Sequence, residues 1–525
     1  MTTNLPAPGY FSPVWFEVPD VARRTSEASV WIDDVMFERV EPPAGGFAAD
    51  RTYSSAFVPR ASDAAVFGSR KTARSRISAR QVPLTPAENA LNGFAAPKEG
   101  LVLGHYDFYM NEKTADFRVW NGAGGLDEAS VDISKLAPGE HEVTVRAFGR
   151  DWKANVRKLA YRKGATQVNR WSRSLVHDGE PVLMSAPCLI GDDVALRGDG
   201  GATAIDVLAE AGFRYLLLEN HATVANIEKN ARLMDLAAKK GMKFVVWPLE
   251  GDLSERGFIK GTDGKPSDWS RQRMYGLLDS ENVLVQMVMD EPEYRRPEDV
   301  RAFMAREKAR FPYKPVLMNN TWLGIDGRFA GLPTDVLMLV NQLTCEGATV
   351  DGVVSCVDVL RSIAPGKPCW YFLCGENSLH SRVPSYGEQF AQCWGTVAAG
   401  ASGLSWFANL PTAKCNFEAM RDANRELLEQ TDFLCSDELC GGAIANGPTG
   451  AVRCLTRRRG NEWRVYAVNV TPDANDRVTV TLPHDMPQTA VVEVLYENRT
   501  LAFRGGRAVD GFAPYARHVY RIVLF

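Results

Sequence analysis

Between residues 176 and 435, eight short apolar segments alternate with helical segments, and this rhythm constrains the fold more than any other feature. The apolar segments are nearly continuous, which is typical of parallel strands buried on both faces. The helical segments are amphipathic: Ile227, Ala231 and Met234 share one face of residues 225–240. Eight such units in about 250 residues predict a closed (β/α)8 barrel. We expect strands at 184–190, 214–220, 243–249, 282–292, 314–322, 335–343, 368–376 and 403–409.

The segments on either side of this region are typical of β structure. Short runs rich in Val, Phe, Trp and Tyr, separated by Gly, Pro, Asn and Asp, recur over residues 1–175, apart from the Ala-, Ser- and Arg-rich residues 66–95, and over residues 440–525. The N-terminal part is either one sandwich or a short remnant followed by one sandwich. The predicted fold is therefore a TIM barrel over 176–435, flanked by an N-terminal and a C-terminal β-sandwich domain. Asp178-Gly179 predicts a hairpin turn just before the barrel. For the C-terminal sandwich, two interpretations remain open: a structural domain packed on the barrel, or a carbohydrate-binding domain.

Composition and charge exclude several classes of function. Lys and Arg number 60 and Asp and Glu number 64, a net charge of −4, which argues against a nucleic-acid partner. No window approaches 18 uninterrupted apolar residues, so no membrane span is expected. No signal peptide is visible, which leaves a cytoplasmic location, or an extracellular or periplasmic one if a leader was removed.

The cysteines and the basic runs carry no recognisable functional spacing. The ten cysteines form no CxxC pair, and several lie in apolar runs, so they are expected to be buried free thiols. The short basic runs RKTARSR and TRRRG are interpreted as solvated segments.

In barrels of this kind the active site lies at the carboxyl ends of the strands, so the residues there are the functional candidates. These ends carry carboxylates, amides, indoles and one imidazole. They lack a paired Cys and His, a His cluster with metal spacing and a basic phosphate clamp, so no cofactor and no metal is expected. The candidates are Glu219, His221, Trp247, Asp290, Glu291, Asn320, Trp322, Asn341, Glu376 and Trp406.

This set of side chains suits an oligosaccharide or polysaccharide substrate. Amides both donate to and accept from hydroxyl groups, and indole faces stack on the CH surfaces of pyranose rings. Two carboxyl groups can divide the acid and nucleophile roles at a glycosidic bond. Glu291 follows the fourth predicted strand and Glu376 the seventh, which lie across the barrel mouth from each other.

The chain resembles the clan of retaining glycoside hydrolases with (β/α)8 barrels, whose acid/base follows strand four and whose nucleophile follows strand seven. The resemblance covers residues 180–430 and the β–barrel–β layout. It implies Glu291 as acid/base, Glu376 as nucleophile and Trp406 as a strand-eight tryptophan at the sugar site. A narrower resemblance to endo-β-1,3-glucanases of this clan rests on the compact spacing of the two Glu residues.

One position departs from the pattern of that clan. The clan usually has Asn immediately before the acid, where this chain has Asp290. An Asp there would accept a hydrogen bond from a sugar hydroxyl and would favour the protonated form of Glu291 by like-charge repulsion. Glu219 and Glu346 remain rivals of Glu376 for the nucleophile.

The sequence thus predicts a retaining glycoside hydrolase that cleaves a β-linked glycan by double displacement. The main alternative is a catalytically inactive glycan-binding barrel protein of a polysaccharide-utilisation system; the presence of both Glu291 and Glu376 argues against it. A barrel enzyme of another class, such as a metal-dependent hydrolase or lyase, would need His and Asp ligands at several strand ends, and only His221 is near one.

Overall fold

The computed structural model describes most of the chain beyond residue 82. The described residues are 83–91, 100–190, 203–220, 224–248, 268–292, 296–320, 332–340, 349–362, 366–375, 383–407, 411, 413–447 and 452–524. No helix among them is both long enough and apolar enough to cross a membrane.

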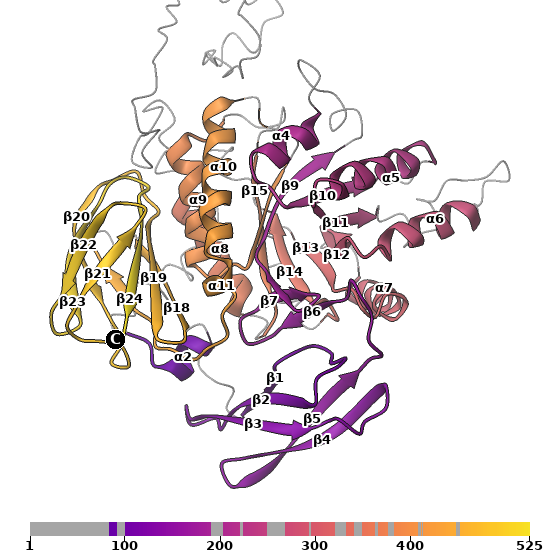
Figure 1. Cartoon of the computed structure of the whole chain (residues 1–525), viewed down its shortest axis with the longest axis horizontal. Coiled ribbons are helices and arrows are strands. Elements are labelled where there is room, and N and C mark those ends of the chain that lie inside the picture. The colour runs from indigo at the N-terminus through magenta and orange to yellow at the C-terminus, as the bar shows by residue number, and fades with distance from the viewer. Residues whose placement is uncertain are drawn as a thin grey trace, which may run out of the picture.

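A closed barrel of eight parallel strands forms the centre of the molecule (Figure 1). Each strand pairs with the next along the chain, and the eighth pairs with the first to close the ring. Every segment predicted as a barrel strand contains one of them, so the predicted fold class is confirmed. The strands are β9 (Met184–Ile190), β10 (Tyr215–Asn220), β11 (Lys243–Pro248), β12 (Val283–Asp290), β13 (Val316–Asn320), β14 (Val336–Val340), β15 (Cys369–Cys374) and β16 (Gly403–Phe407).

Helices surround the barrel and have the end signals expected from their sequences. Thr203 and Ser385 cap two of them by accepting a backbone N–H from the residue three positions on, in reciprocal capping boxes. Gly212 and Gly241 follow two helices with φ of 85° and 76°, a conformation that glycine adopts without strain. The helices are α4 (Ala204–Glu210), α5 (Val224–Ala238), α6 (Asp268–Leu278), α7 (Pro297–Arg310), α8 (Val350–Ser362), α9 (Tyr386–Ala398) and α10 (Lys414–Glu429).

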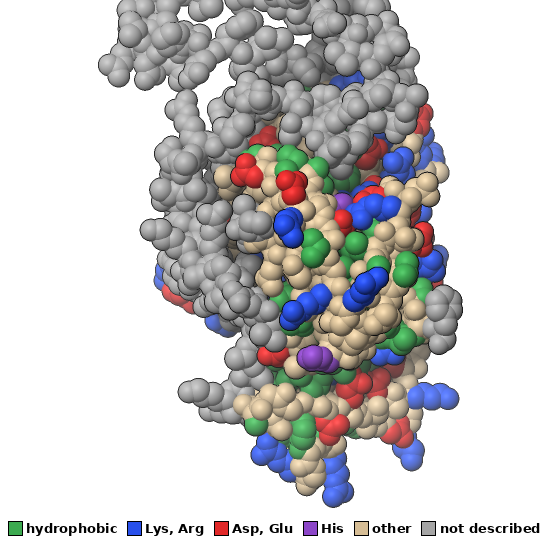
Figure 2. Space-filling model, turned by 90° about the vertical axis from the view of Figure 1, so that its left-hand side faces the viewer, with side chains coloured by type: hydrophobic (Ala, Val, Ile, Leu, Met, Phe, Trp, Pro, Cys, Tyr) green, Lys and Arg blue, Asp and Glu red, His purple; other side chains and the backbone are tan. Residues whose placement is uncertain are grey.

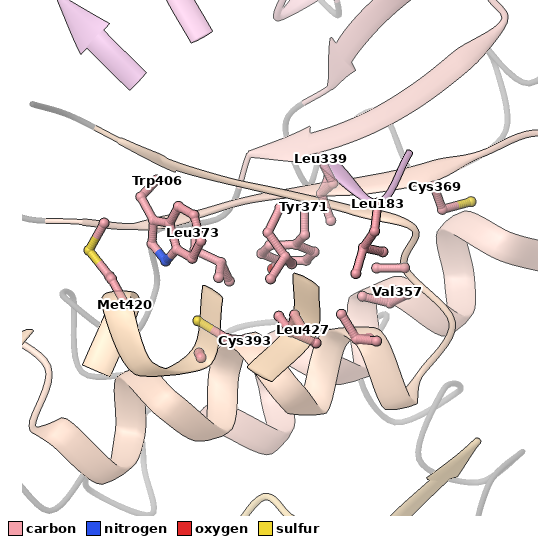
Figure 3. Packing of buried hydrophobic residues seen from close by; sticks show 14 of the residues in the cluster. Leu183, Leu339, Val357, Cys369, Tyr371, Leu373, Cys393, Trp406, Met420 and Leu427 are labelled. Carbon is pink, nitrogen blue, oxygen red and sulfur yellow. The ribbon is translucent and has the colours of Figure 1, made fainter. Parts of the chain in front are cut away.

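Two apolar cores lie on opposite faces of the barrel strands. The outer core fills the space between strands and helices, as with Leu339 and Leu373, which Figure 3 shows among side chains from α8, α9 and α10. The inner core lies inside the barrel and includes Leu217 and Phe372. Which core a residue joins therefore tells whether its side chain points outward or inward.

A small antiparallel sheet closes the amino end of the barrel. It consists of β6 (Thr166–Asn169), β7 (Ser174–His177) and β8 (Glu180–Val182), and its residues Val168, Leu175 and Val182 join the inner core. The turn between β7 and β8 is the hairpin predicted at Asp178-Gly179. Among the described residues, packed side chains therefore close the amino end of the barrel interior.

The N-terminal β structure has a core of its own. The strands β1 (Leu101–Gly104), β2 (Thr114–Trp120) and β3 (Leu126–Asp132) form one sheet, and β4 (Gly139–Ala147) and β5 (Arg150–Lys158) form a hairpin. Phe117 and Val119 of the sheet share a buried cluster with Val145 and Val156 of the hairpin. Two β layers that enclose a common core form a sandwich-like unit here, while residues 1–82 of the expected N-terminal domain lie outside the described residues.

The C-terminal β structure is a sandwich of two antiparallel sheets. One sheet has the order β17-β20-β23 and the other β18-β19-β24-β21-β22, with an apolar core shared between them. On the face that Figure 2 shows, basic and acidic side chains are interspersed. The strands are β17 (Ile444–Asn446), β18 (Val452–Arg459), β19 (Glu462–Asn469), β20 (Asn475–Thr481), β21 (Ala490–Leu495), β22 (Arg499–Phe503), β23 (Arg507–Phe512) and β24 (Arg517–Val523).

Buried contacts fasten this sandwich to α9 and α10. The rings of Trp394 and Tyr466 stack with their centroids 5.9 Å apart. Arg517 donates from Nε to the Glu426 carboxylate at 2.9 Å and from a terminal nitrogen at 2.5 Å, and both side chains are buried. A buried bidentate ion pair fixes the orientation of both partners, so these contacts favour a structural role for the sandwich.

Candidate active site

The carboxyl end of β12 places two acidic residues at the barrel mouth. Asp290 is the last residue of the strand and is in register with Asn319 of β13. Its carboxylate accepts a hydrogen bond from the Asn319 side-chain amide at 2.7 Å. Asn319 is buried and follows Leu317 of the inner core by two positions, so both polar side chains lie on the inward face of the sheet.

Glu291 adopts an unusual backbone conformation at this strand end. Its φ is +42°, in the left-handed region that costs an ordinary residue about 1–2 kcal/mol. Its N–H donates to the Asn319 carbonyl at 2.9 Å, and its side chain is exposed. Strain of this kind persists where the surrounding structure enforces it, and it is concentrated at functional sites.

Asn320, the residue next to Asn319, makes structural hydrogen bonds and not the predicted contact with substrate. Asn320 is in register with Leu339, which belongs to the outer core. Its amide donates to the Met338 carbonyl at 3.0 Å, and the residue is only 4% exposed. The predicted contact between Asn320 and substrate is therefore wrong: this side chain ties β13 to β14, and Asn319 is the one that faces the barrel interior.

Trp406 is also not a residue of the mouth. It lies on the outward face of β16, in register with Leu373 of β15, and is fully buried. Its ring meets that of Phe213 edge to face, with centroids 5.9 Å apart. Figure 3 shows it pointing toward the helices, beside Met420 and Cys393. The predicted sugar contact is wrong because the alternation of side chains along β16 turns this residue into the outer core.

Buried amides hold the end of β15, just before Glu376. Gln389 donates to the Cys374 carbonyl at 3.0 Å, and Asn416 donates to the Gly375 carbonyl at 2.7 Å. Both amide side chains are fully buried. The Gly375 N–H donates to the Phe407 carbonyl at 2.5 Å, which continues the pairing with β16. The backbone that leads into Glu376 is thus fixed from α9, from α10 and from the next strand.

This anchoring was not expected from the sequence, although polar residues on the barrel side of α9 and α10 were a possible signal. Cys374 differs from expectation as well, because it is disulfide-bonded rather than a free thiol.

The remaining candidates can be placed only in part. Glu219 and Trp247 are paired in register at the ends of β10 and β11, while their side chains lie outside the described part of the structure. His221, Trp322, Asn341 and Glu376, with the rival Glu346, lie outside the described residues altogether. Within the described ranges, no group of three or more His, Cys, Asp or Glu side chains could hold a metal ion.

Comparisons with known proteins give only distant likenesses. No family model and no curated protein matches the sequence. A protein from Bacteroides vulgatus provisionally classed as a glycoside hydrolase is 11% identical with a TM-score of 0.48, covering 82% of this chain and 98% of that one. An α-amylase from Geobacillus thermoleovorans is 11% identical with a TM-score of 0.45, covering 65% of this chain and 98% of that one. A GH30 endoxylanase from Clostridium papyrosolvens is 12% identical with a TM-score of 0.38, covering 65% of this chain and 97% of that one. Likenesses this distant do not decide function, which has to be argued from the residues of the chain.

Proposed function

We propose that this chain is a glycoside hydrolase that cleaves a β-linked glycan with retention of configuration. The observation that carries the proposal is Glu291, an exposed carboxylic acid on a strained turn at the open end of a closed barrel. The neighbouring Asp290 is held by Asn319 on the inward face of the strands. Two acids and an amide at the mouth of a barrel are suited to a sugar, whose hydroxyls need both donors and acceptors.

In the first step, Glu291 protonates the glycosidic oxygen while Glu376 attacks the anomeric carbon. The bond from that carbon to the leaving oxygen breaks, and an ester forms between the sugar and the Glu376 carboxylate. Gln389 and Asn416 support this step because they fix the backbone immediately before Glu376. A nucleophile needs such fixation because a shift of about 1 Å at the reacting carbon can cost about 100-fold in rate.

In the second step, Glu291 changes from acid to base and the Glu376 carboxylate becomes the leaving group. Glu291, now deprotonated, removes a proton from water, and the water oxygen attacks the anomeric carbon. The ester to Glu376 breaks and Glu291 ends protonated again, so the enzyme returns to its starting state. The second displacement restores the original configuration at the anomeric carbon, whereas a single displacement by water would invert it.

Asp290 and Asn319 are proposed to bind the sugar beside the scissile bond. Asn319 donates to Asp290 at 2.7 Å, which holds the carboxylate at the barrel mouth, where we propose that it accepts from a sugar hydroxyl. This pair would replace the single amide that usually precedes the acid in the clan that the chain resembles. The further residues proposed to line the substrate cleft are Glu219, His221, Trp247, Trp322 and Asn341.

The test is hydrolysis of a panel of β-linked polysaccharides, β-1,3-glucan among them, and of aryl glycosides. Glu291→Ala should slow glycosides with poor leaving groups far more than activated aryl glycosides, because only the former need the proton. Glu298→Ala is a matched control, since Glu298 is an exposed acid in the first turn of α7. Equal losses on both kinds of leaving group would argue against Glu291 as the acid, and no hydrolysis of any panel member would argue against the function.

A further inference from the structure

A pocket lies at the amino end of the barrel, where three parts of the chain meet. Its wall is formed by α2 (Pro86–Ala90), by β2, by the turn between β6 and β7, by the segment 436–440 that follows α11 (Thr431–Leu434), and by β18. Arg118, Arg173 and Arg457 line it together with Trp171. Its empty volume is ≈ 300 Å³, which includes the solvent at its open mouth. We call it the junction pocket.

Arg173 is buried in this pocket with no counter-charge among the described residues. It is 6% exposed, and its Nε has no hydrogen-bond partner in the part of the chain that the structure describes. Its φ is +57°, so the turn holds it in a left-handed conformation. Burial, and then the positive charges of Arg361 and Arg457, hold the pKa of its guanidinium well below the usual value. The environment of this side chain is therefore apolar and cationic.

Arg457 has the same lack of charge compensation. It belongs to the TRRRG run, which was expected to be solvated, yet it is 9% exposed. Among the described residues it donates to backbone carbonyls alone, to Leu434 at 3.2 Å and to Thr456 at 3.4 Å. Burial lowers the pKa of its guanidinium as well. The sequence-based expectation failed here because the strand turns the first arginine of the run inward.

The acids that line the pocket are already engaged elsewhere. Asp437 lies 2.7 Å from the His105 imidazole and accepts from the Asn169 amide at 2.8 Å. Glu438 accepts from the Gly460 N–H at 2.9 Å. These bonds give both carboxylates partners other than the two buried arginines.

The third arginine has its own partner. Arg118 donates to the Glu128 carboxylate at 2.8 Å and stacks on the Trp171 ring, 4.2 Å from its centroid. Two positive charges, those of Arg173 and Arg457, are left without an acidic partner in the described structure. An unpaired buried charge costs several kcal/mol, so a site with two of them strongly favours a bound anion.

We propose that the junction pocket binds a small tetrahedral oxyanion, of the phosphate or sulfate class, between Arg173 and Arg457. The two guanidinium groups reach it from different elements, which matches oxygens that point in several directions better than the two coplanar oxygens of a carboxylate. The bound anion would join the base of the barrel to the C-terminal sandwich, and Arg118 brings the N-terminal sheet to the same pocket. It would therefore stabilise the assembly of the three parts.

The test is thermal unfolding of the full chain in inorganic phosphate, sulfate, acetate and chloride at equal ionic strength. A ligand that binds only the folded state raises Tm in a saturable way. We expect such a rise with phosphate and sulfate, and none with acetate beyond the chloride baseline. Titration calorimetry with inorganic phosphate should give one site per chain. A rise with acetate equal to that with phosphate, or no rise with any anion, would overturn the proposal.

Substitutions of the two arginines test whether phosphate raises Tm by binding in the junction pocket. Arg173→Met and Arg457→Met should each weaken phosphate binding by more than about tenfold, because each removes charge-assisted hydrogen bonds. Arg173→Met should keep or raise Tm in chloride, since it removes an unpaired buried charge. Arg477→Met, on an exposed face of β20, is the control and should keep the phosphate response. A phosphate response that persists in both pocket variants would contradict the proposal.

Discussion

Replacing Trp406 by Ala separates a structural role from a role in substrate binding. The side chain is fully buried between β16 and the helices and packs edge to face on Phe213. Truncation of a buried Trp leaves a cavity and costs about 3–5 kcal/mol. For a barrel of this size, each kcal/mol corresponds to about 2–4 °C in Tm, so the barrel transition should fall by roughly 6–20 °C.

The assay is thermal unfolding followed by circular dichroism, with KM measured on the best substrate of the panel below the lowered Tm. Tyr161→Ala is the control, because Tyr161 is an aromatic residue that is 64% exposed, and its loss should change Tm little. The expected result is a large fall in Tm for Trp406→Ala with KM nearly unchanged. An unchanged Tm with a raised KM would refute the placement of Trp406 in the outer core.

Four further outcomes follow from the described contacts. Gln389→Leu removes the amide that donates to the Cys374 carbonyl and should lower kcat about 10- to 100-fold with little change in KM, as steady-state kinetics would show. Burial, aided by Lys243, lowers the pKa of His177 to about 4. The unfolded chain therefore takes up a proton there first, so Tm should fall as pH drops from about 6.5 to 4, and less so in His177→Gln. Glu426→Leu removes the bidentate partner of the buried Arg517, which keeps Glu497 at 3.6 Å, and should cost about 1.5–3 kcal/mol in urea unfolding, part of it recovered when Arg517→Met is added. Activity should survive EDTA; loss that a divalent ion restores would mean that a metal takes part.

The barrel could be predicted because its signal is local and repeated. Each strand is a short apolar run between helical segments, and this pattern is repeated eight times along the chain. The two acids at the end of β12 followed from the position of that strand alone. The hairpin at Asp178-Gly179 followed from turn chemistry in the same way.

The direction of individual side chains could not be predicted, because it depends on parity along each strand. The pairing of β12 with β13 shifts at a bulge between Met287 and Met289, which resets which residues share a face. A difference of one position separates Asn319, which faces inward, from Asn320, which does not. The alternation of side chains along β16 places Trp406 in the outer core, and the position of Arg457 along β18 turns it toward the junction pocket.

Long-range anchoring was equally invisible in the sequence. Gln389 and Asn416 reach the end of β15 from helices that follow it in the chain, and no local pattern marks them as its partners. Buried amides in helices are normally a cost, so their presence on the barrel side of α9 and α10 is a usable sign of such a function in other chains.

The most direct test of the central claim is identification of the nucleophile by mass spectrometry. The intact enzyme would be treated with the 2-deoxy-2-fluoro analogue of the aryl glycoside that it hydrolyses best, so that the glycosyl ester accumulates, and then digested with protease. A retaining enzyme with the assigned roles should carry the sugar on the peptide that contains Glu376, and Glu376→Ala should remain unlabelled. A label on the peptide of Glu219 or Glu346, or turnover with inverted product configuration and no label, would contradict the account.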